Sequence, residues 1–149
     1  MNHVDPALAH AKPLPVPDAD SKTYWEALRQ GHLLLQHCAD CGNVQAYHQA
    51  ICRKCGSARF ACRPASGNGT VYSFSVVHRA PGPAFRDDTP YAVLLVELDE
   101  GPHVISSLTG ATPEVATFGL RVRLVCEAVT DEISLPRFTP AEPGPQSTK

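Results

Sequence analysis

Four cysteines in two C-x2-C pairs are the residues of this sequence best suited to chemistry. The four are Cys38, Cys41, Cys52 and Cys55. Ten residues separate the two pairs, and a glycine, Gly42 or Gly56, follows the second cysteine of each. Zn²⁺ takes four thiolates tetrahedrally, and a C-x2-C turn places two sulfurs on one side of the ion. Glycine permits the tight turn because it reaches positive φ without a steric penalty. The sequence therefore predicts one structural zinc ion, with no coordination position left for water or substrate.

Other uses of the same cysteines remain open. Two disulfides or a redox C-x-x-C pair would need the same residues, but doubled pairs with trailing glycines favour a metal. Iron is the alternative metal, because tetrahedral sulfur sites accept both ions. His37 and His48 lie near the ligands in sequence, yet four thiolates already fill the shell. Cys62 and Cys126 are expected to be free thiols, with Cys126 packed in the core.

The amino-acid composition limits which kinds of partner and which cellular compartment fit this chain. The chain of 149 residues has 13 basic and 15 acidic side chains, a formal charge of -2. Nucleic-acid binding relies on clustered Lys and Arg, so this balance disfavours DNA or RNA. Residues 1–21 lack the apolar segment of a secretion signal, and no stretch reaches the roughly 20 apolar residues of a membrane span. Cysteines without a secretion signal predict a reducing compartment, the cytoplasm.

The chain divides into four expected segments: a proline-rich flexible arm (1–22), a helix with the zinc ribbon (23–62), a barrel (63–140) and a flexible tail (141–149). Thr23 with Glu26 fits a capping box, and Gly31 fits the helix end. The apolar face of this helix, with Tyr24 and Trp25, must be buried against something. These two aromatic residues are candidates for either core packing or partner contact.

From Gly67 onward the residue pattern is that of β-strands. The expected strands cover 70–78, 91–98, 103–108, 121–129 and 133–138, and a further strand, 32–36, leads into the first cysteine pair. The strand 91–98 is almost continuously apolar. Five short strands in about 70 residues suggest a small, partly open Greek-key barrel, the OB-fold. The sequence therefore predicts a mainly β protein with a short N-terminal helix, a zinc ribbon and a five-stranded barrel.

The connection 79–90 is long for a β-hairpin. Long loops in compact domains are often functional, and this one joins the first two barrel strands. It offers Phe85 as an apolar anchor between Arg79 and Arg86, two possible contacts for an anion. A solvated loop stiffened by prolines is the alternative interpretation.

Several short signatures occur in one order between residues 24 and 140. They are a short helix, Gln36-x-Cys38-x-x-Cys41-Gly42, Cys52-x-x-Cys55-Gly56, Gly67-x-Gly69-x-Val71-Tyr72-Ser73-Phe74-x-Val76-Val77, Pro90-Tyr91, Val96-Glu97-Leu98-Asp99-Glu100-Gly101 and Leu135-Pro136-x-Phe138. This order resembles the family catalogued as domain of unknown function thirty-five. The resemblance implies a rubredoxin-like zinc ribbon fused to an OB-fold. It also implies an acyl-CoA-associated accessory protein that works beside thiolases, ketoacyl synthase-like enzymes or aldolases of steroid side-chain degradation.

The residues supply no catalytic arrangement of their own for such chemistry. A thiolase needs a cysteine activated by a base, and an aldolase needs an acid/base pair in a pocket. We therefore expect a non-catalytic zinc-binding subunit of a hetero-oligomer, which docks on a thiolase-like, ketoacyl synthase-like or aldolase subunit and helps to bind acyl-CoA. The expected contact residues are Tyr24, Trp25, Arg79, Phe85 and Arg86.

Two functions of other classes stay open. One is a module that binds single-stranded nucleic acid, since zinc ribbons and OB-folds both recur in such proteins. The other is a free-standing enzyme acting on acyl thioesters through Cys62, His78 or His103.

Overall fold

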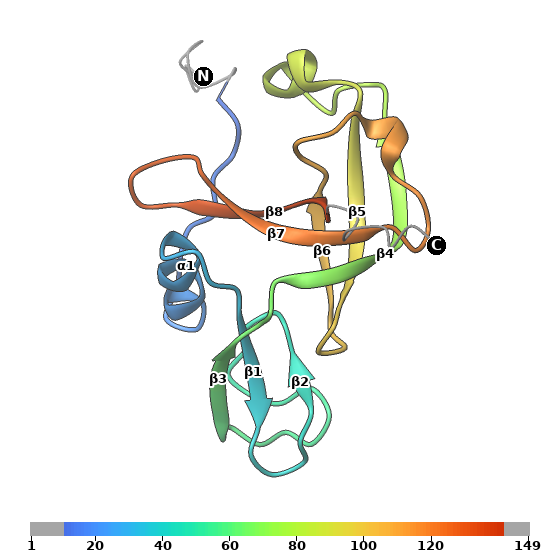
Figure 1. The fold of residues 1–149 in the computed structure, drawn as a ribbon. Helices are drawn as coiled ribbons and strands as arrows, with labels where there is room; N and C mark the ends of the chain where they lie inside the picture. The colour runs from blue at the N-terminus through green and yellow to red at the C-terminus, as the bar shows by residue number, and fades with distance from the viewer. Residues whose placement is uncertain (1–10, 142–149) are drawn as a thin grey trace, which may run out of the picture.

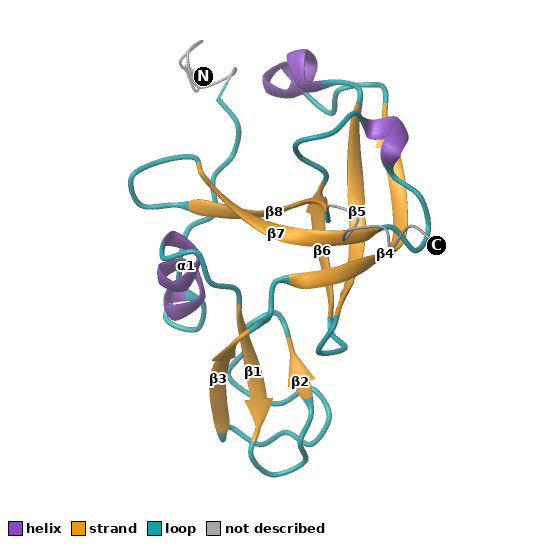
Figure 2. Ribbon diagram, in the orientation of Figure 1, coloured by secondary structure: helices purple, strands orange, loops and turns teal. Residues whose placement is uncertain are grey.

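The computed structural model describes residues 11–141, which form one α-helix, two short 3-10 helices and two β-sheets (Figures 1 and 2). The expected mainly β fold, with a short helix, the ribbon and then the barrel, is confirmed. The expected arm is described only from residue 11, and the expected tail lies outside the described residues except for residue 141.

Helix α1 spans Lys22–Arg29 and begins earlier than the expected capping box. That expectation was wrong: Ser21 occupies the N-cap position and Thr23 lies inside the helix. The Asp18 carboxylate orders the turn before the helix, accepting hydrogen bonds from the Ser21 backbone N–H (2.8 Å) and hydroxyl (2.7 Å). Gly31 ends the helix as expected, with φ 89°. No helix within residues 11–141 has the length and apolar character needed to cross a membrane.

The first sheet has three strands in the order β2-β1-β3, all antiparallel to their neighbours. They are β1 (Leu34–Cys38), β2 (Val44–Gln45) and β3 (Phe60–Pro64). Leu33 and Leu35 are fully buried at the start of β1, where they join Leu28 of α1 in the core. Since α1 also packs against the last two strands of the chain, it lies between the ribbon and the barrel (Figure 1).

The second sheet is the barrel, with strand order β6-β5-β4-β7-β8. The strands are β4 (Asn68–Val77), β5 (Tyr91–Leu98), β6 (His103–Ser107), β7 (Arg121–Ala128) and β8 (Ser134–Pro140). A parallel bridge between Leu108 and Phe138 brings β6 to β8 and nearly closes the barrel. Two short 3-10 helices, Pro83–Asp88 and Pro113–Val115, lie in the connections. Phe138 is fully buried among the inward side chains.

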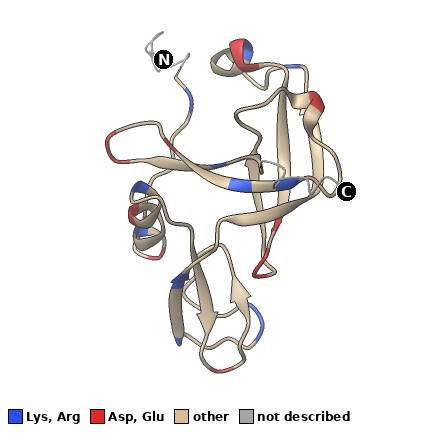
Figure 3. Cartoon of the chain, in the orientation of Figure 1, with Lys and Arg blue, Asp and Glu red and all other residues tan. Residues whose placement is uncertain are grey.

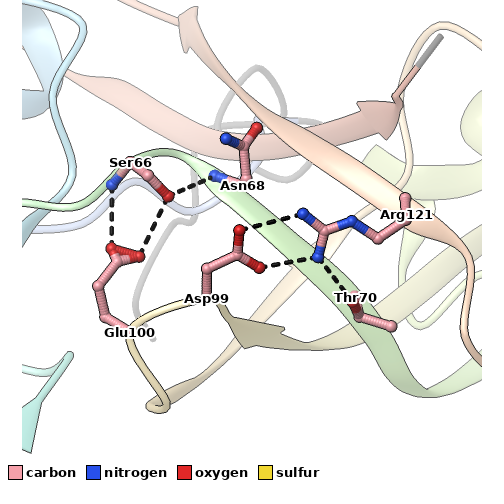
Figure 4. A network of polar contacts seen from close by, with 6 residues as sticks. All are labelled: Ser66, Asn68, Thr70, Asp99, Glu100 and Arg121. Atoms are coloured by element: carbon pink, nitrogen blue, oxygen red, sulfur yellow. Dashed lines mark hydrogen bonds and ion pairs between the residues drawn. The ribbon is translucent and has the colours of Figure 1, made fainter. Parts of the chain in front are cut away.

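A polar network holds the ribbon–barrel junction (Figure 4). Glu100, in the turn after β5, accepts hydrogen bonds from the Ser66 backbone N–H (3.0 Å) and hydroxyl (3.2 Å). The guanidinium of Arg121 binds both carboxylate oxygens of Asp99, at 2.7 and 3.0 Å, and the hydroxyl of Thr70 at 2.9 Å. These hydrogen bonds hold the pKa of Asp99 below its usual value. The network therefore ties the linker after β3 to three barrel strands.

Candidate metal centre and surrounding surfaces

The structure brings all four predicted cysteine ligands together. Their sulfur atoms lie within 4.8 Å of one another, with Cys38–Cys55 at 3.6 Å and Cys41–Cys52 at 3.7 Å. A tetrahedral Zn²⁺ with bonds of about 2.3 Å places its sulfurs about 3.8 Å apart. A disulfide would bring two sulfurs to about 2.0 Å. The observed spacing fits one zinc ion in a closed tetrahedral shell and excludes disulfides between these residues.

The same backbone turn positions each pair. The N–H of Gly42 donates to the carbonyl of Cys38 at 3.0 Å, and the N–H of Gly56 donates to that of Cys52 at 2.8 Å. Both glycines have positive φ, 74° and 78°, as the tight turn requires. The two turns therefore present their sulfurs in equivalent ways.

The turns favour the thiolate form that a metal requires at the first cysteine of each pair, Cys38 and Cys52. The backbone N–H of Cys55 donates toward the sulfur of Cys52. Together with the backbone N–H of Lys54 and the nearby thiols, it lowers the pKa of Cys52 to about 6. The backbone N–H of Cys41 lowers the pKa of Cys38 in the same way. At Cys55 the backbone N–H of Ser57 acts in the same direction, but desolvation and the three neighbouring thiols raise the pKa overall. Cys38 and Cys52 are buried while Cys55 is exposed, so the cluster lies at the ribbon surface with one side covered.

Neighbouring amides support the ligands, and sequence reasoning missed them. The side-chain amide of Asn43 donates toward the sulfur of Cys52, one of the predicted ligands, at 3.6 Å. Gln36 and Gln45 are both buried and face one another across β1 and β2, with an amide hydrogen bond of 2.8 Å. The one available signal was their position: each is a polar residue at an inward position of a strand beside a ligand pair.

These two glutamines connect the ribbon's central loop to the second cysteine pair. Gln36 accepts from the backbone N–H of Gln49 and donates to its carbonyl, both at 3.0 Å. Gln45 accepts from the backbone N–H of Arg53 at 3.2 Å, inside the second pair. The buried amides therefore hold the loop between the pairs in place.

Neither nearby histidine belongs to the cluster. Within residues 11–141, the group of His, Cys, Asp and Glu side chains arranged to hold a metal consists of the four cysteines. The Nε2 atom of His48 lies 3.2 Å from the carbonyl of Leu34, and its ring packs against Tyr24 at 5.4 Å between centroids. His48 is thus part of the packing between α1 and the ribbon, and its burial lowers its pKa.

The five expected contact residues lie in two separate places. Tyr24 is buried in the core, where burial raises the pKa of its hydroxyl, and its neighbour Trp25 is half-buried with an edge-to-face ring contact of 5.0 Å. Phe85 and Arg86 lie in the 3-10 helix 83–88, with Arg79 shortly before it; both arginines are exposed. Figure 1 shows α1 well apart from this loop.

The arm makes contact with the loop 79–90. The ammonium of Lys12 pairs with Asp88 at 2.6 Å and lies 5.9 Å from the ring centroid of Phe85. A cavity of about 250 Å³ lies beside these residues, and its wall includes Arg137, whose guanidinium bonds to Glu127 at 3.3 Å. The loop therefore borders a hollow at the end of the barrel instead of standing free in solvent.

The residues suggested for independent catalysis belong to different elements. Cys62 is exposed on β3, His78 follows β4, and His103 begins β6, where its Nε2 lies 3.0 Å from a Glu97 carboxylate oxygen. Cys126 is half-buried on β7, where burial raises its pKa. The histidine with a carboxylate partner has no nucleophile hydrogen-bonded to it within the described residues.

Known proteins resemble the chain over both parts of its fold. Residues 25–61 match the family model described as ChsH2, rubredoxin-like zinc ribbon domain, and residues 62–127 match ChsH2, C-terminal OB-fold domain. A probable enoyl-CoA hydratase alpha subunit of Thermomonospora curvata is 37% identical over 91% of this chain, which spans only 42% of that relative's length.

Two further matches have a length closer to that of this chain. A DUF35 domain-containing scaffold protein of Methanocaldococcus jannaschii is 31% identical over 72% of this chain and 77% of its own length. Among solved structures, a chain of the Ltp2-ChsH2(DUF35) aldolase has a TM-score of 0.76 and 36% identity, covering 85% of this chain and 98% of its own.

Proposed function

The chain belongs to the DUF35 family of ChsH2-type zinc-ribbon and OB-fold proteins, and from this premise we propose that it is a non-catalytic accessory subunit of an acyl-CoA enzyme. In this proposal it docks on a thiolase-like, ketoacyl synthase-like, aldolase or hydratase subunit in the cytoplasm. It contributes to binding the acyl-CoA substrate, while the partner supplies the reacting groups.

The observation that carries the proposal is the closed four-thiolate cluster. Its four sulfurs lie at tetrahedral spacing, so a bound zinc has no open position at which to activate water or substrate. Such an ion stabilises the fold, by on the order of 10 kcal/mol in small zinc modules. The ribbon is then a rigid element suited to docking, and zinc is the proposed metal.

The loop 79–90 is the proposed contribution to acyl-CoA binding. Arg79 and Arg86 are exposed and form no ion pair within the described residues, so they are available to the phosphates of coenzyme A. Phe85 lies between them at the edge of the cavity beside Lys12. Trp25, half-buried on α1 and well apart from this loop, is a proposed partner contact.

The barrel argues against the nucleic-acid alternative. OB-folds bind oligonucleotides on the face of their second and third strands, which are β5 and β6 here. Neither strand contains Lys or Arg, and neither does β4 beside them (Figure 3). A groove that binds the sugar-phosphate backbone of a single strand needs Lys or Arg on this face, because their charges replace the counterions of the phosphates.

Co-expression tests the proposal. The chain is produced together with a candidate thiolase-like, aldolase or hydratase subunit from the same organism, and the mixture is analysed by size-exclusion chromatography. We expect a stable complex, and acyl-CoA turnover by the partner that falls when this chain is omitted. A partner that is fully active alone and never co-elutes would refute the proposal.

A second assay tests the free-standing enzyme. If the purified chain alone hydrolyses a simple acyl-CoA and loses this activity on Cys62→Ala, the reacting groups are its own and the accessory role is wrong. A salt-dependent shift of single-stranded DNA would instead favour the nucleic-acid module.

A further inference from the structure

The outer face of β5 carries apolar side chains, although a face on the outside of the barrel is expected to contact water. An antiparallel sheet with one face in water normally alternates buried apolar and exposed polar residues. The inward residues of β5 are buried as required, but the outward positions next to them are Val93 and Leu95, both half-buried. This pair explains the near-continuous apolar sequence of the strand. A strand with this pattern is typically covered on both faces, and within residues 11–141 the barrel core covers only one.

Neighbouring strands leave the two aliphatic side chains accessible. Across the sheet, Val93 lies between Ser75 of β4 and Ser107 of β6. Leu95 lies between Ser73 and Ile105 in the same way. The serines are too short to cover the aliphatic groups between them, and a pocket of about 240 Å³ results. Its lining includes Ser73, Ser75, Val93, Leu95 and Ile105, which together we term the apolar face.

The border of the apolar face is aromatic and already hydrogen-bonded. Ile105 is 65% exposed, and Tyr72, 58% exposed, packs on the ring of His103 at 4.6 Å. From the ribbon, the hydroxyl of Tyr47 accepts the backbone N–H of Ile105 at 2.9 Å. Because the Tyr47 hydroxyl already accepts this backbone N–H of the edge strand β6, a foreign strand cannot pair with it. Addition of a strand to β6 is therefore disfavoured. The exposed groups are suited to side-chain docking instead.

We propose that the apolar face is the docking surface for the catalytic subunit, which inserts a large apolar side chain into the pocket between β4 and β6. This inference rests on the proposed function and adds where the partner binds. Large exposed apolar patches rimmed by polar residues mark protein–protein interaction sites. Anchors that fill pockets carry most of the binding energy of such interfaces.

Charge indicates the chemistry of the partner surface. The five residues of the apolar face carry no charge, and the strands β4, β5 and β6 contain no Lys or Arg; the carboxylate of Glu97, at the border, lies 3.0 Å from Nε2 of His103. The apolar face is therefore close to neutral. A complementary partner presents an uncharged, apolar surface there, because an unpaired charge would be desolvated without compensation.

Area favours a larger partner over a second copy of this chain. An aromatic side chain buries about 150–250 Å². Tyr72 is 58% exposed and Tyr47 is 44% exposed, so together they expose an area of roughly one whole aromatic side chain. Ile105 and the pocket add a similar area. Stable interfaces bury about 800 Å² per partner. A symmetric dimer confined to this face falls short of that area, whereas a larger partner can also cover the adjoining ribbon.

Two variants test the apolar face in different ways. Ser75→Phe fills the pocket without adding charge, and Ile105→Glu places a carboxylate on it. Val16→Glu is the matched control, since Val16 is 87% exposed in the arm, apart from the apolar face. Zinc content and thermal unfolding confirm that each variant is folded, and calorimetric titration with the catalytic subunit that forms a complex on co-expression gives the affinity.

We expect each face variant to weaken binding at least about tenfold, which is 1.4 kcal/mol, and the control to leave it unchanged. If the wild type binds and both folded face variants bind equally well, the docking surface is elsewhere and the inference is wrong. If no such subunit binds the wild type, the proposed function fails and the inference fails with it. A dimer of the isolated chain that Ile105→Glu abolishes would assign the face to a second copy, which also overturns the inference.

Discussion

The buried amide of Gln36 offers a sharp test of how the ribbon supports its metal ligands. Gln36→Met keeps the length of the side chain and removes every hydrogen bond it makes. The 2.8 Å bond from the Gln45 amide is lost, as are both 3.0 Å bonds to the backbone of Gln49. Gln45 keeps a 3.5 Å contact with the carbonyl of Ile51, so it is only partly deprived of acceptors.

The expected loss follows from these contacts. A buried polar group left without its partner costs about 1–3 kcal/mol. Gln45 is 5% exposed and cannot turn to water, while Gln49 is exposed and can. We therefore expect Gln36→Met to destabilise the ribbon by about 2–3 kcal/mol. Because zinc binding and ribbon folding are coupled, the same loss predicts roughly 30- to 150-fold weaker zinc binding.

Competition with a zinc chelator measures this affinity, and denaturant unfolding measures the stability of the metal-loaded chain. Gln30→Met is the matched control, because Gln30 is exposed at the end of α1 and should leave zinc binding unchanged. If Gln36→Met binds zinc within about threefold of wild type, equivalent to about 0.7 kcal/mol, the buried amides do not hold the metal site and the reasoning is wrong.

Three further predictions concern the metal, pH and the barrel. The wild-type chain should contain about one zinc by metal analysis, and Cys52→Ser should lose it and unfold the ribbon; a metal-free variant with an unchanged circular-dichroism spectrum would contradict this. Burial lowers the pKa of His48 below 6.5, so the stability that the neutral ring contributes is fully present above pH 6.5 and declines as the pH falls below it. The free energy of unfolding, measured against pH, should therefore decline less in His48→Gln than in the wild type. Equal slopes in the two proteins would refute this role. Gly69→Ala should destabilise the barrel by about 1–3 kcal/mol, because the new methyl would lie 2.6 Å from Val96 and 2.8 Å from the carbonyl of Glu97; Gly82→Ala, with no atom within 4 Å, is the control for thermal unfolding.

The cysteine cluster could be predicted from the sequence because its geometry is local. Two residues fit between the cysteines of each pair, a glycine follows each pair, and a turn of that length presents both sulfurs whatever the surrounding fold. The barrel strands were also predictable. The strand 91–98 has the bounds expected, because alternation and β-branched residues report local burial along a strand.

Contacts between distant segments could not be predicted in the same way. Gln36 and Gln45 are unremarkable in sequence, and only the pairing of β1 with β2 makes them a buried amide pair. Tyr24 and Trp25 are adjacent on one helix, and nothing in their spacing shows that the first is buried and the second is half-exposed.

The sequence by itself determined the two cysteine pairs, the order of the strands along the chain and the family, since each depends on residue types at short spacing. Only the tertiary structure decided which surfaces these elements share. The apolar face exists because three strands place Ser73, Leu95 and Ile105 in one row, and the register of a sheet is a property of paired strands. Pairing is non-local, so a pattern that indicates burial along one strand cannot indicate what covers its second face.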